Sequence, residues 1–124
     1  MDGFIKSGIV MRGDVTCPIA LAATVLSDQW TVIVLRDIAF FNKRTFGSIL
    51  ENNNEKIPRP TLANRLKRLC DIGLLTARGD AKHAQRKVYS LTERALGLLP
   101  VMVGMGNWTL SQEGVRTQEI EFFE

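Results

Sequence analysis

The sequence predicts a mainly α-helical domain that carries one small β-hairpin. Apolar residues recur at helical spacing through most of the chain. Two short segments with strand-like composition, 75–78 and 87–91, are joined by a polar loop that contains Gly79 and Asp80. The chain has 124 residues, of which 45% are hydrophobic, enough for one core and too few for two domains of usual size. Residues 1–124 are therefore expected to form a single domain.

Two helices are predicted in the first part of the chain. Pro18 suits the first position of a helix, and the apolar residues that follow at helical spacing are Ile19, Ala22, Ala23 and Leu26. Ser27 and Asp28 both offer N-cap oxygens to the next helix, from Trp30 to about Phe40. That second helix is apolar almost all round, so we expect it to be the central helix of the core. Asn42 tolerates the left-handed conformation that ends many helices.

The stretch PRPTLANRLKRLCDIGLL predicts a two-faced helix from about Pro60 to Ile72, after a short helix capped by Thr45. Leu62, Leu66 and Leu69 fall on one face at about 100° per residue. The opposite face carries Thr61, Asn64, Arg65 and Arg68. Ile72 projects toward that polar face, and Gly73 is a natural terminator.

Charge is unevenly distributed along the chain, whose formal net charge is +3. Residues 56–87 hold nine basic and two acidic side chains, whereas the tail after Leu110 holds four acids and one arginine. A basic surface attracts any polyanion, but most charged helix faces are merely solvated. From charge alone, both interpretations stay open.

A last helix is predicted to begin at Thr92 and Glu93. Its apolar positions are Leu96, Leu99, Val103 and Gly106 or Trp108, with Pro100 as a weak point. Spacing does not decide whether this seam, Trp108 included, packs in the core or forms a dimer surface.

The predicted order of helix, short helix, basic helix, basic hairpin and closing helix is that of the winged helix-turn-helix. Residues with specific spacing lie along that order: Cys17-Pro18-Ile19, Trp30-Thr31, Ile33, Leu35, Arg36, Asp37, Phe46, Ile57, Leu62, Arg65-Leu66, Leu69, Gly73-Leu74, Arg86 and Tyr89-Ser90-Leu91-Thr92. Together they resemble the HxlR family of prokaryotic transcriptional regulators over about Cys17 to Leu110.

This resemblance implies a homodimer, formed through the terminal helices, that binds two-fold symmetric operator DNA and represses or activates genes, sometimes in response to a chemical signal. The sequence departs from the family at three positions. Pro58 stands where a serine usually caps the recognition helix, Pro60 adds a second proline, and Ala95 replaces a glycine. No effector is identified.

Within that fold, the helix at about 60–72 is expected to enter the major groove and the wing at about 75–91 to hold flanking DNA. Base edges are assigned to Thr61, Asn64, Arg65 and Arg68, and phosphates to Arg59, with Lys67 at the flank of the helix and Thr45 and Lys43 before the preceding helix as weaker candidates. The expected wing contacts are Lys82, Arg86 and Lys87, with Arg78 beside them; Arg86 has a structural alternative, bracing the wing. The rival hypothesis is a winged-helix module that binds RNA or an acidic protein partner.

Cys17 is the candidate redox sensor, since a thiol just before a helix can have its thiolate stabilised by the helix N-terminus. Some members of the resembled family sense oxidants or electrophiles through a cysteine at this place. The structural alternative is a small buried thiol. Cys70, on the basic helix, is expected to be packed or idle.

Enzymatic, metal-binding and membrane functions find little support in the sequence. The single histidine, His83, lies in a predicted loop, and no nucleophile, base and orienting group form a set. Cys17, Cys70 and His83 lack metal-ligand spacing, so no metal or cofactor is expected. The longest apolar stretch, around 32–41, is interrupted by charge, and no export signal is recognised, so we expect a cytoplasmic protein with free thiols.

Overall fold

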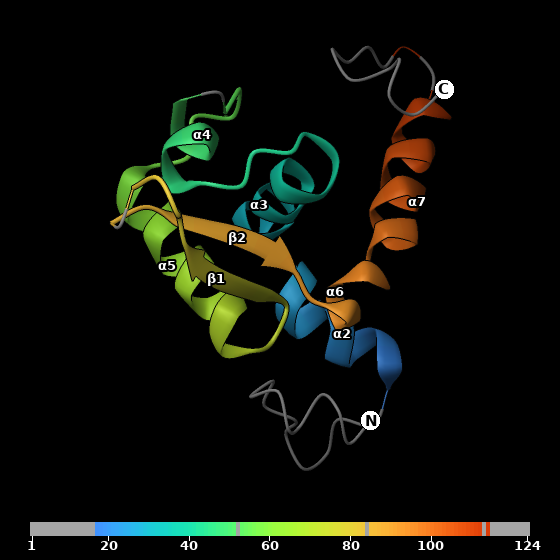
Figure 1. Ribbon diagram of the computed structural model, residues 1–124. Helices are drawn as coiled ribbons and strands as arrows, with labels where there is room; N and C mark the ends of the chain where they lie inside the picture. Colours follow the sequence, from blue (N-terminus) through green and yellow to red (C-terminus); the bar gives the residue numbers. More distant parts are fainter. Residues whose placement is uncertain (1–16, 52, 84, 113, 115–124) are drawn as a thin grey trace.

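The computed structural model describes residues 17–51, 53–83, 85–112 and 114, and shows helices gathered around a two-stranded hairpin (Figure 1). The elements are α2 (Pro18–Leu26), α3 (Gln29–Phe40), α4 (Phe46–Glu51), α5 (Arg59–Asp71), β1 (Leu75–Gly79), β2 (Lys87–Leu91), α6 (Glu93–Leu96) and α7 (Leu99–Leu110). The predicted class, mainly α with a small β-hairpin, is confirmed.

Helix α3 is the central helix, as predicted. It buries Val34, Leu35 and Ile38, and Figure 1 shows it between α5 with the hairpin on one side and α7 on the other. Asp28 caps its first turn by accepting a hydrogen bond from the Thr31 amide over 3.1 Å. After its last turn, Asn42 has φ 52°, the predicted left-handed conformation.

Helix α2 packs through a different face from the predicted one. Leu21 and Val25 are buried, whereas Ile19 is 80% exposed and Ala23 is exposed. Apolar residues surround this helix, so spacing alone could not select a face. In the structure, where α2 contacts α3, the buried residues are Leu21 and Val25, and Ala22 and Leu26 beside them are half-buried.

Among the described residues, no single helix has both the length and the apolar content needed to cross a bilayer. Helices α2 and α3 meet that requirement only when taken together, as a pair bent by 80°.

The connector between α4 and α5 is fixed by a buried polar network. Asn53 Nδ2 donates to Asp37 Oδ2 over 3.0 Å, and Asn53 Oδ1 accepts from the Ile57 amide over 3.2 Å. Asp37 is fully buried and also pairs with Arg36, whose guanidinium reaches Glu55 as well. Because buried polar groups are costly when unpaired, this network holds the connector in place up to Ile57, just before α5.

The hairpin is antiparallel, with Leu75 opposite Leu91 and Gly79 opposite Lys87. The inner residue Leu75 is buried, so the base of the hairpin joins the core. The outer end of the hairpin is exposed and carries the loop 80–86.

The C-terminal part forms two helices, α6 and α7, and not the single predicted helix. Thr92 caps α6 as predicted, but the helix ends at Gly97 and Leu98. Pro100 then lies in the first turn of α7, where its missing N–H is tolerated, whereas inside one continuous helix it would remove a hydrogen bond. The turn also changes the buried face. Met102 is buried, whereas Leu96, predicted on the seam, is 50% exposed.

Candidate nucleic-acid interface

Helix α5 begins one residue earlier than predicted, at Arg59, and it begins regularly despite its prolines. Pro58 is the N-cap with extended backbone, φ −64° and ψ 143°, and its carbonyl accepts the Leu62 amide over 2.9 Å. Pro60 lies in the first turn, where an N–H would have no helical partner. The absent serine cap therefore leaves the start of the helix intact.

The inner side of α5 is the predicted leucine row. Leu62, Leu66 and Leu69 are almost completely buried. Ile72, predicted to project toward the polar side, is instead buried in the core, since it follows the last helical turn and its direction is no longer set by the helical period. Four buried apolar side chains thus hold α5 against the domain.

The exposed, outer side of α5 is shifted from the predicted one: of the four residues predicted there, only Asn64 is exposed, and Thr61, Arg65 and Arg68 are half-buried. Pro60, Ala63, Asn64 and Lys67 are exposed on consecutive turns. Lys67 Nζ forms an exposed ion pair with Asp71 over 3.1 Å, which contributes little to stability. Asn64 and Lys67 are therefore the polar side chains best placed to reach a ligand that lies along this helix.

Arg65 lies on the flank of α5 and is engaged with α3. Its Nε donates to Asp28 Oδ2 over 2.5 Å and its Nη2 to Asp28 Oδ1 over 3.2 Å, while its Nη1 donates to Asn64 Oδ1 over 2.8 Å. The hydrogen bond from Arg65 is the main reason that the pKa of Asp28 falls from 3.8 to about 2. The pair is therefore charged at neutral pH, and it ties the two helices together.

Arg68, Thr61 and Arg59 surround this outer side. Arg68 Nη2 donates to the Thr24 carbonyl of α2 over 3.0 Å, and both Arg68 and Thr61 are half-buried. Arg59 is exposed at the start of α5, with its guanidinium 5.4 Å from the centre of the Phe46 ring. Arg59 thus has charge available at the helix start, whereas Arg68 also connects helices.

The hairpin presents the predicted basic residues at its outer end. Arg78, Lys82, Arg86 and Lys87 are all exposed. Asp80 orders the loop by accepting the Lys82 amide over 2.9 Å, and its carboxylate lies 3.9 Å from the Arg86 guanidinium. Arg86 consequently has both a bracing partner and exposure to solvent, so the two interpretations of this residue are compatible.

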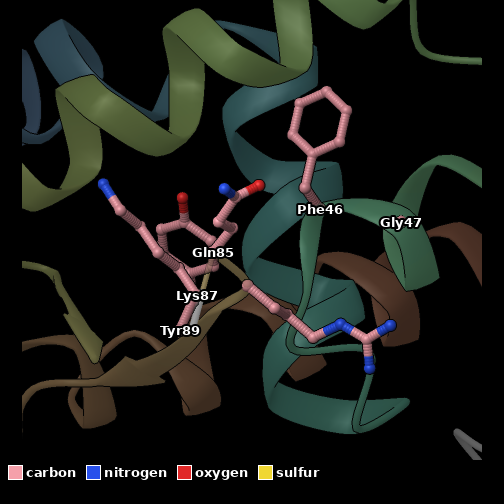
Figure 2. Close-up of a pocket in the computed structure, with 6 residues that line it drawn as sticks. Phe46, Gly47, Gln85, Lys87 and Tyr89 are labelled. Carbon is pink, nitrogen blue, oxygen red and sulfur yellow. The ribbon is translucent and has the colours of Figure 1, made fainter. Parts of the chain in front are cut away.

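A pocket of about 170 Å³ separates α4 from the wing. Its lining residues are Phe46, Gly47, Gln85, Arg86, Lys87 and Tyr89. Figure 2 shows Lys87 and Tyr89 extending side by side from β2, with Phe46 on the other side. The pocket makes the surface between helix and wing concave and partly cationic.

Thr45 caps α4 reciprocally with Ser48, as the sequence predicted for this residue. Its Oγ1 accepts the Ser48 amide over 3.1 Å, and Ser48 Oγ accepts the Thr45 amide over 3.0 Å. Lys43, one of the weaker candidates, has its Nζ 5.4 Å from the Phe41 ring centre. Both residues lie ahead of α4, outside the outer side of α5.

The two cysteines have different environments. Cys17 is exposed at the N-cap of α2, and the helix makes no side-chain hydrogen bond to it. Cys70 is half-buried on α5, and burial, together with nearby Asp71, raises the pKa of its thiol. Of the two, Cys17 is the more accessible to a reagent. Within the described ranges, no three His, Cys, Asp or Glu side chains gather closely enough to hold a metal ion.

Two relationships in this region were not foreseen from the sequence. Asp28 was recognised as a cap but not as the partner of Arg65, because the two are 37 residues apart and only the packing of α3 on α5 joins them. Arg44 was also missed. Its side chain donates to the Tyr89 carbonyl and to Ser90 Oγ, which anchors β2 to the segment before α4. Arg44 lies between Lys43 and Thr45 in the sequence, and nothing in that local sequence indicates that its side chain anchors β2.

The chain is similar to known regulators. The model of the HxlR-like helix-turn-helix family matches residues 25–116. Over 87 residues the chain is 36% identical to the uncharacterized HTH-type transcriptional regulators Rv3095 of Mycobacterium tuberculosis and Mb3122 of Mycobacterium bovis, covering 70% of this chain and 53% of theirs. The chain thus spans about half the length of the curated relatives it matches.

Solved structures give the same result at 25% identity. PA1607 superposes with a TM-score of 0.69, covering 84% of this chain and 75% of that one. The redox regulator HypR in its oxidized form superposes with a TM-score of 0.67, covering 80% of this chain and 100% of HypR. The reduced form of the transcriptional regulator YodB from B. subtilis superposes with a TM-score of 0.63, covering 82% of this chain and 100% of YodB. The resemblance found in the sequence motifs is confirmed.

Proposed function

The chain belongs to the HxlR-like helix-turn-helix family, and on that premise we propose that it is a transcriptional regulator that binds operator DNA sequence-specifically in the cytoplasm. One observation carries the proposal: the leucine row fixes α5 to the core and leaves its opposite side, with Asn64 and Lys67, facing solvent. A helix held in this way can enter the major groove without losing its packing.

In this proposal the contacts divide by chemistry. Asn64 reads a base edge, because an amide can donate to and accept from adenine at once. Arg59 and Lys67 bind phosphates beside the groove, with Thr45 and Lys43 as weaker neighbours. Thr61 and Arg68 are half-buried at the flank and reach DNA only at its edge.

The wing is proposed to hold the flanking backbone through Lys82, Arg86 and Lys87, with Arg78 beside them. These side chains are exposed on a hairpin whose base is buried in the core. A cationic tip on a fixed hairpin adds affinity for phosphate without selecting a sequence.

We further propose that the protein is a homodimer through α7. Val101, Met105 and Trp108 follow one another at helical spacing and are all exposed, Trp108 by 67%. Large apolar side chains arranged in this way mark an interaction surface. A two-fold dimer would give an operator with two-fold symmetry.

Cys17 is proposed as the sensing residue if the regulator responds to oxidants or electrophiles. Its exposure and the similarity to the redox regulator HypR support this assignment. Treatment with hydrogen peroxide should then weaken operator binding by the wild type and leave Cys17→Ser unaffected. An equal response in Cys17→Ser would remove Cys17 from the mechanism.

The test of DNA binding is fluorescence anisotropy with the duplex upstream of the gene and a scrambled duplex, over a salt series. Lys67→Ala should weaken both duplexes and lower the salt slope by about one. Arg94→Ala, which changes an exposed arginine on α6, is the matched control and should change neither.

Equal, steeply salt-dependent binding to both duplexes would contradict sequence-specific recognition by this protein. Absence of binding to either duplex at low salt would contradict the DNA proposal and favour RNA or an acidic protein partner. Those two alternatives are then separated by the same measurement with a labelled RNA hairpin.

A further inference from the structure

Asp28 holds Arg65 by one edge of its guanidinium, the edge formed by Nε and Nη2. Both carboxylate oxygens accept, Oδ2 from Nε over 2.5 Å and Oδ1 from Nη2 over 3.2 Å. Oδ2 also accepts from Thr31, from its amide over 3.1 Å and from its hydroxyl over 2.8 Å. Thr31 is fully buried, so the carboxylate is fixed by the core on one side and fixes the arginine on the other.

Arg65 in turn determines how the Asn64 amide is oriented. Arg65 Nη1 lies 2.8 Å from Asn64 Oδ1. A guanidinium has only donors, so the Asn64 atom that faces it must be the oxygen and not the nitrogen. Oδ1 retains a second lone pair, and among the described residues Nδ2 donates no hydrogen bond within the protein. The amide is therefore held in one of its two orientations while both of its functional atoms remain available.

We infer that Asp28 and Arg65 are positioning residues, which hold the Asn64 amide in the orientation that reads an adenine edge in the major groove. This inference rests on the proposed DNA-binding function and specifies which residues set the base preference. Adenine offers a donor and an acceptor side by side, and a fixed amide matches them in one order only. Without Arg65 the amide can rotate by half a turn and present the reverse order.

The charges on Asp28 and Arg65 support this positioning role. The pKa of Asp28 lies near 2, so the carboxylate keeps Arg65 in place at neutral pH. Asp28 and Arg65 side chains are 28% and 25% exposed, which leaves them shielded at the flank while Asn64 lies on the exposed outer side. Three of the five N–H groups of the Arg65 guanidinium are directed at Asp28 and Asn64, so direct base reading by Arg65 would depend on the remaining two.

The experiment begins by selecting duplexes from a randomised library with the wild-type protein. Binding is then measured by anisotropy on the selected duplex, on versions with each base pair replaced, and on a scrambled duplex. The variants are Asn64→Ala, Asp28→Asn, Arg65→Lys and the Asp28→Asn/Asn64→Ala double variant. Asn is itself a good N-cap, so Asp28→Asn keeps the start of α3. Glu93→Gln, with the same charge change on α6, is the control.

Asn64→Ala should remove about tenfold of preference at one A·T pair. Asp28→Asn and Arg65→Lys should lose most of the preference at that same pair, and the double variant should lose no more than Asn64→Ala alone. Binding of Asp28→Asn to the scrambled duplex should tighten modestly, because a negative charge is removed. Glu93→Gln should match the wild type.

Three outcomes would overturn the inference. If Arg65→Lys changes the preference at a different base pair and Asp28→Asn sharpens it, Arg65 reads DNA directly. If Asp28→Asn weakens all duplexes equally, Asp28 only supports the helix. If the wild type selects no consensus, the proposed function fails and the inference fails with it. Should Asp28→Asn not fold by circular dichroism, Arg65→Lys carries the same comparison.

Discussion

Arg44 and Tyr89 are joined by two hydrogen bonds, one in each direction. The Tyr89 amide donates to the Arg44 carbonyl over 2.8 Å, and Arg44 Nε donates to the Tyr89 carbonyl over 3.0 Å. Arg44 also donates to Ser90 Oγ. The segment before α4 thus pairs with β2, so the wing is held to the helical part of the domain by more than its own hairpin.

Removing the Arg44 side chain should loosen the wing. Arg44→Ala should lower the free energy of unfolding by about 1 kcal/mol, because the lost hydrogen bonds are exposed. Hydrogen exchange should accelerate at the β2 amides from Lys87 to Leu91. Arg78→Ala, on the paired strand, is the control for losing an exposed arginine. Unchanged exchange in β2 would show that backbone pairing alone holds the wing.

Asn53 should be among the most sensitive polar positions for stability. Asn53→Ala leaves the buried Asp37 carboxylate and the Ile57 amide each without one partner. We expect a loss of about 1 to 3 kcal/mol in urea denaturation. Asn53→Asp should lose more, since it places a second carboxylate beside Asp37. Asn107→Ala, at an exposed position of α7, serves as the comparison. Equal losses for Asn53→Ala and Asn107→Ala would contradict the role given to the buried network.

Stability should fall at acid pH through Asp28. Its pKa is lowered in the folded protein, chiefly by the hydrogen bond from Arg65, so folding favours the ionised carboxyl. The contribution of Asp28 to the free energy of unfolding is complete above the unfolded-state pKa of 3.8, and it is lost as the pH falls through the folded-state pKa of about 2. The pKa of Glu55, lowered by Arg36, acts in the same direction. Urea denaturation should show a shallower acid decline for Asp28→Asn than for Glu93→Gln. Parallel declines would contradict this assignment.

The exposed apolar face of α7 should control association. Trp108→Glu should convert the proposed dimer into a monomer, since it replaces the most exposed of the three apolar side chains with a charge. Analytical ultracentrifugation measures the change. Asn107→Glu adds the same charge at an exposed position on an adjacent face and should remain dimeric. A wild type that sediments as a monomer at high concentration would contradict the proposal directly.

The elements of the fold were largely predictable because their signals are local. Asp28 and Thr92 mark helix starts by cap chemistry, Pro18 marks one by its fixed φ at the first helical position, and the leucines of α5 repeat at a clear helical period. The face of α2 was not predictable, since apolar residues surround it and only contact with α3 selects one side. The break between α6 and α7 was misread because Thr92 and Pro100 were assigned to one helix when each begins its own.

The candidate site was predictable in composition but not in geometry. Helical period placed Arg65 and Arg68 on the polar face with Asn64, and the structure gives both arginines partners on other helices. A guanidinium on a long side chain reaches across a helix flank, so its position in the period does not determine its contacts. The Asn64 side chain is short, and Lys67 pairs with Asp71 on the same helix. The exposure of these two residues therefore follows from their positions in the helical period.

The division of α5 into a leucine row and an exposed outer side bears on how such a protein evolves. Positions 60, 63, 64 and 67 face solvent, whereas Leu62, Leu66 and Leu69 hold the helix. Substitutions at those four positions leave the core unchanged, so under the proposed function a duplicated gene can change its contacts with DNA without first losing a folded product. The same separation makes these four positions the natural library for redesigning specificity on an otherwise constant scaffold.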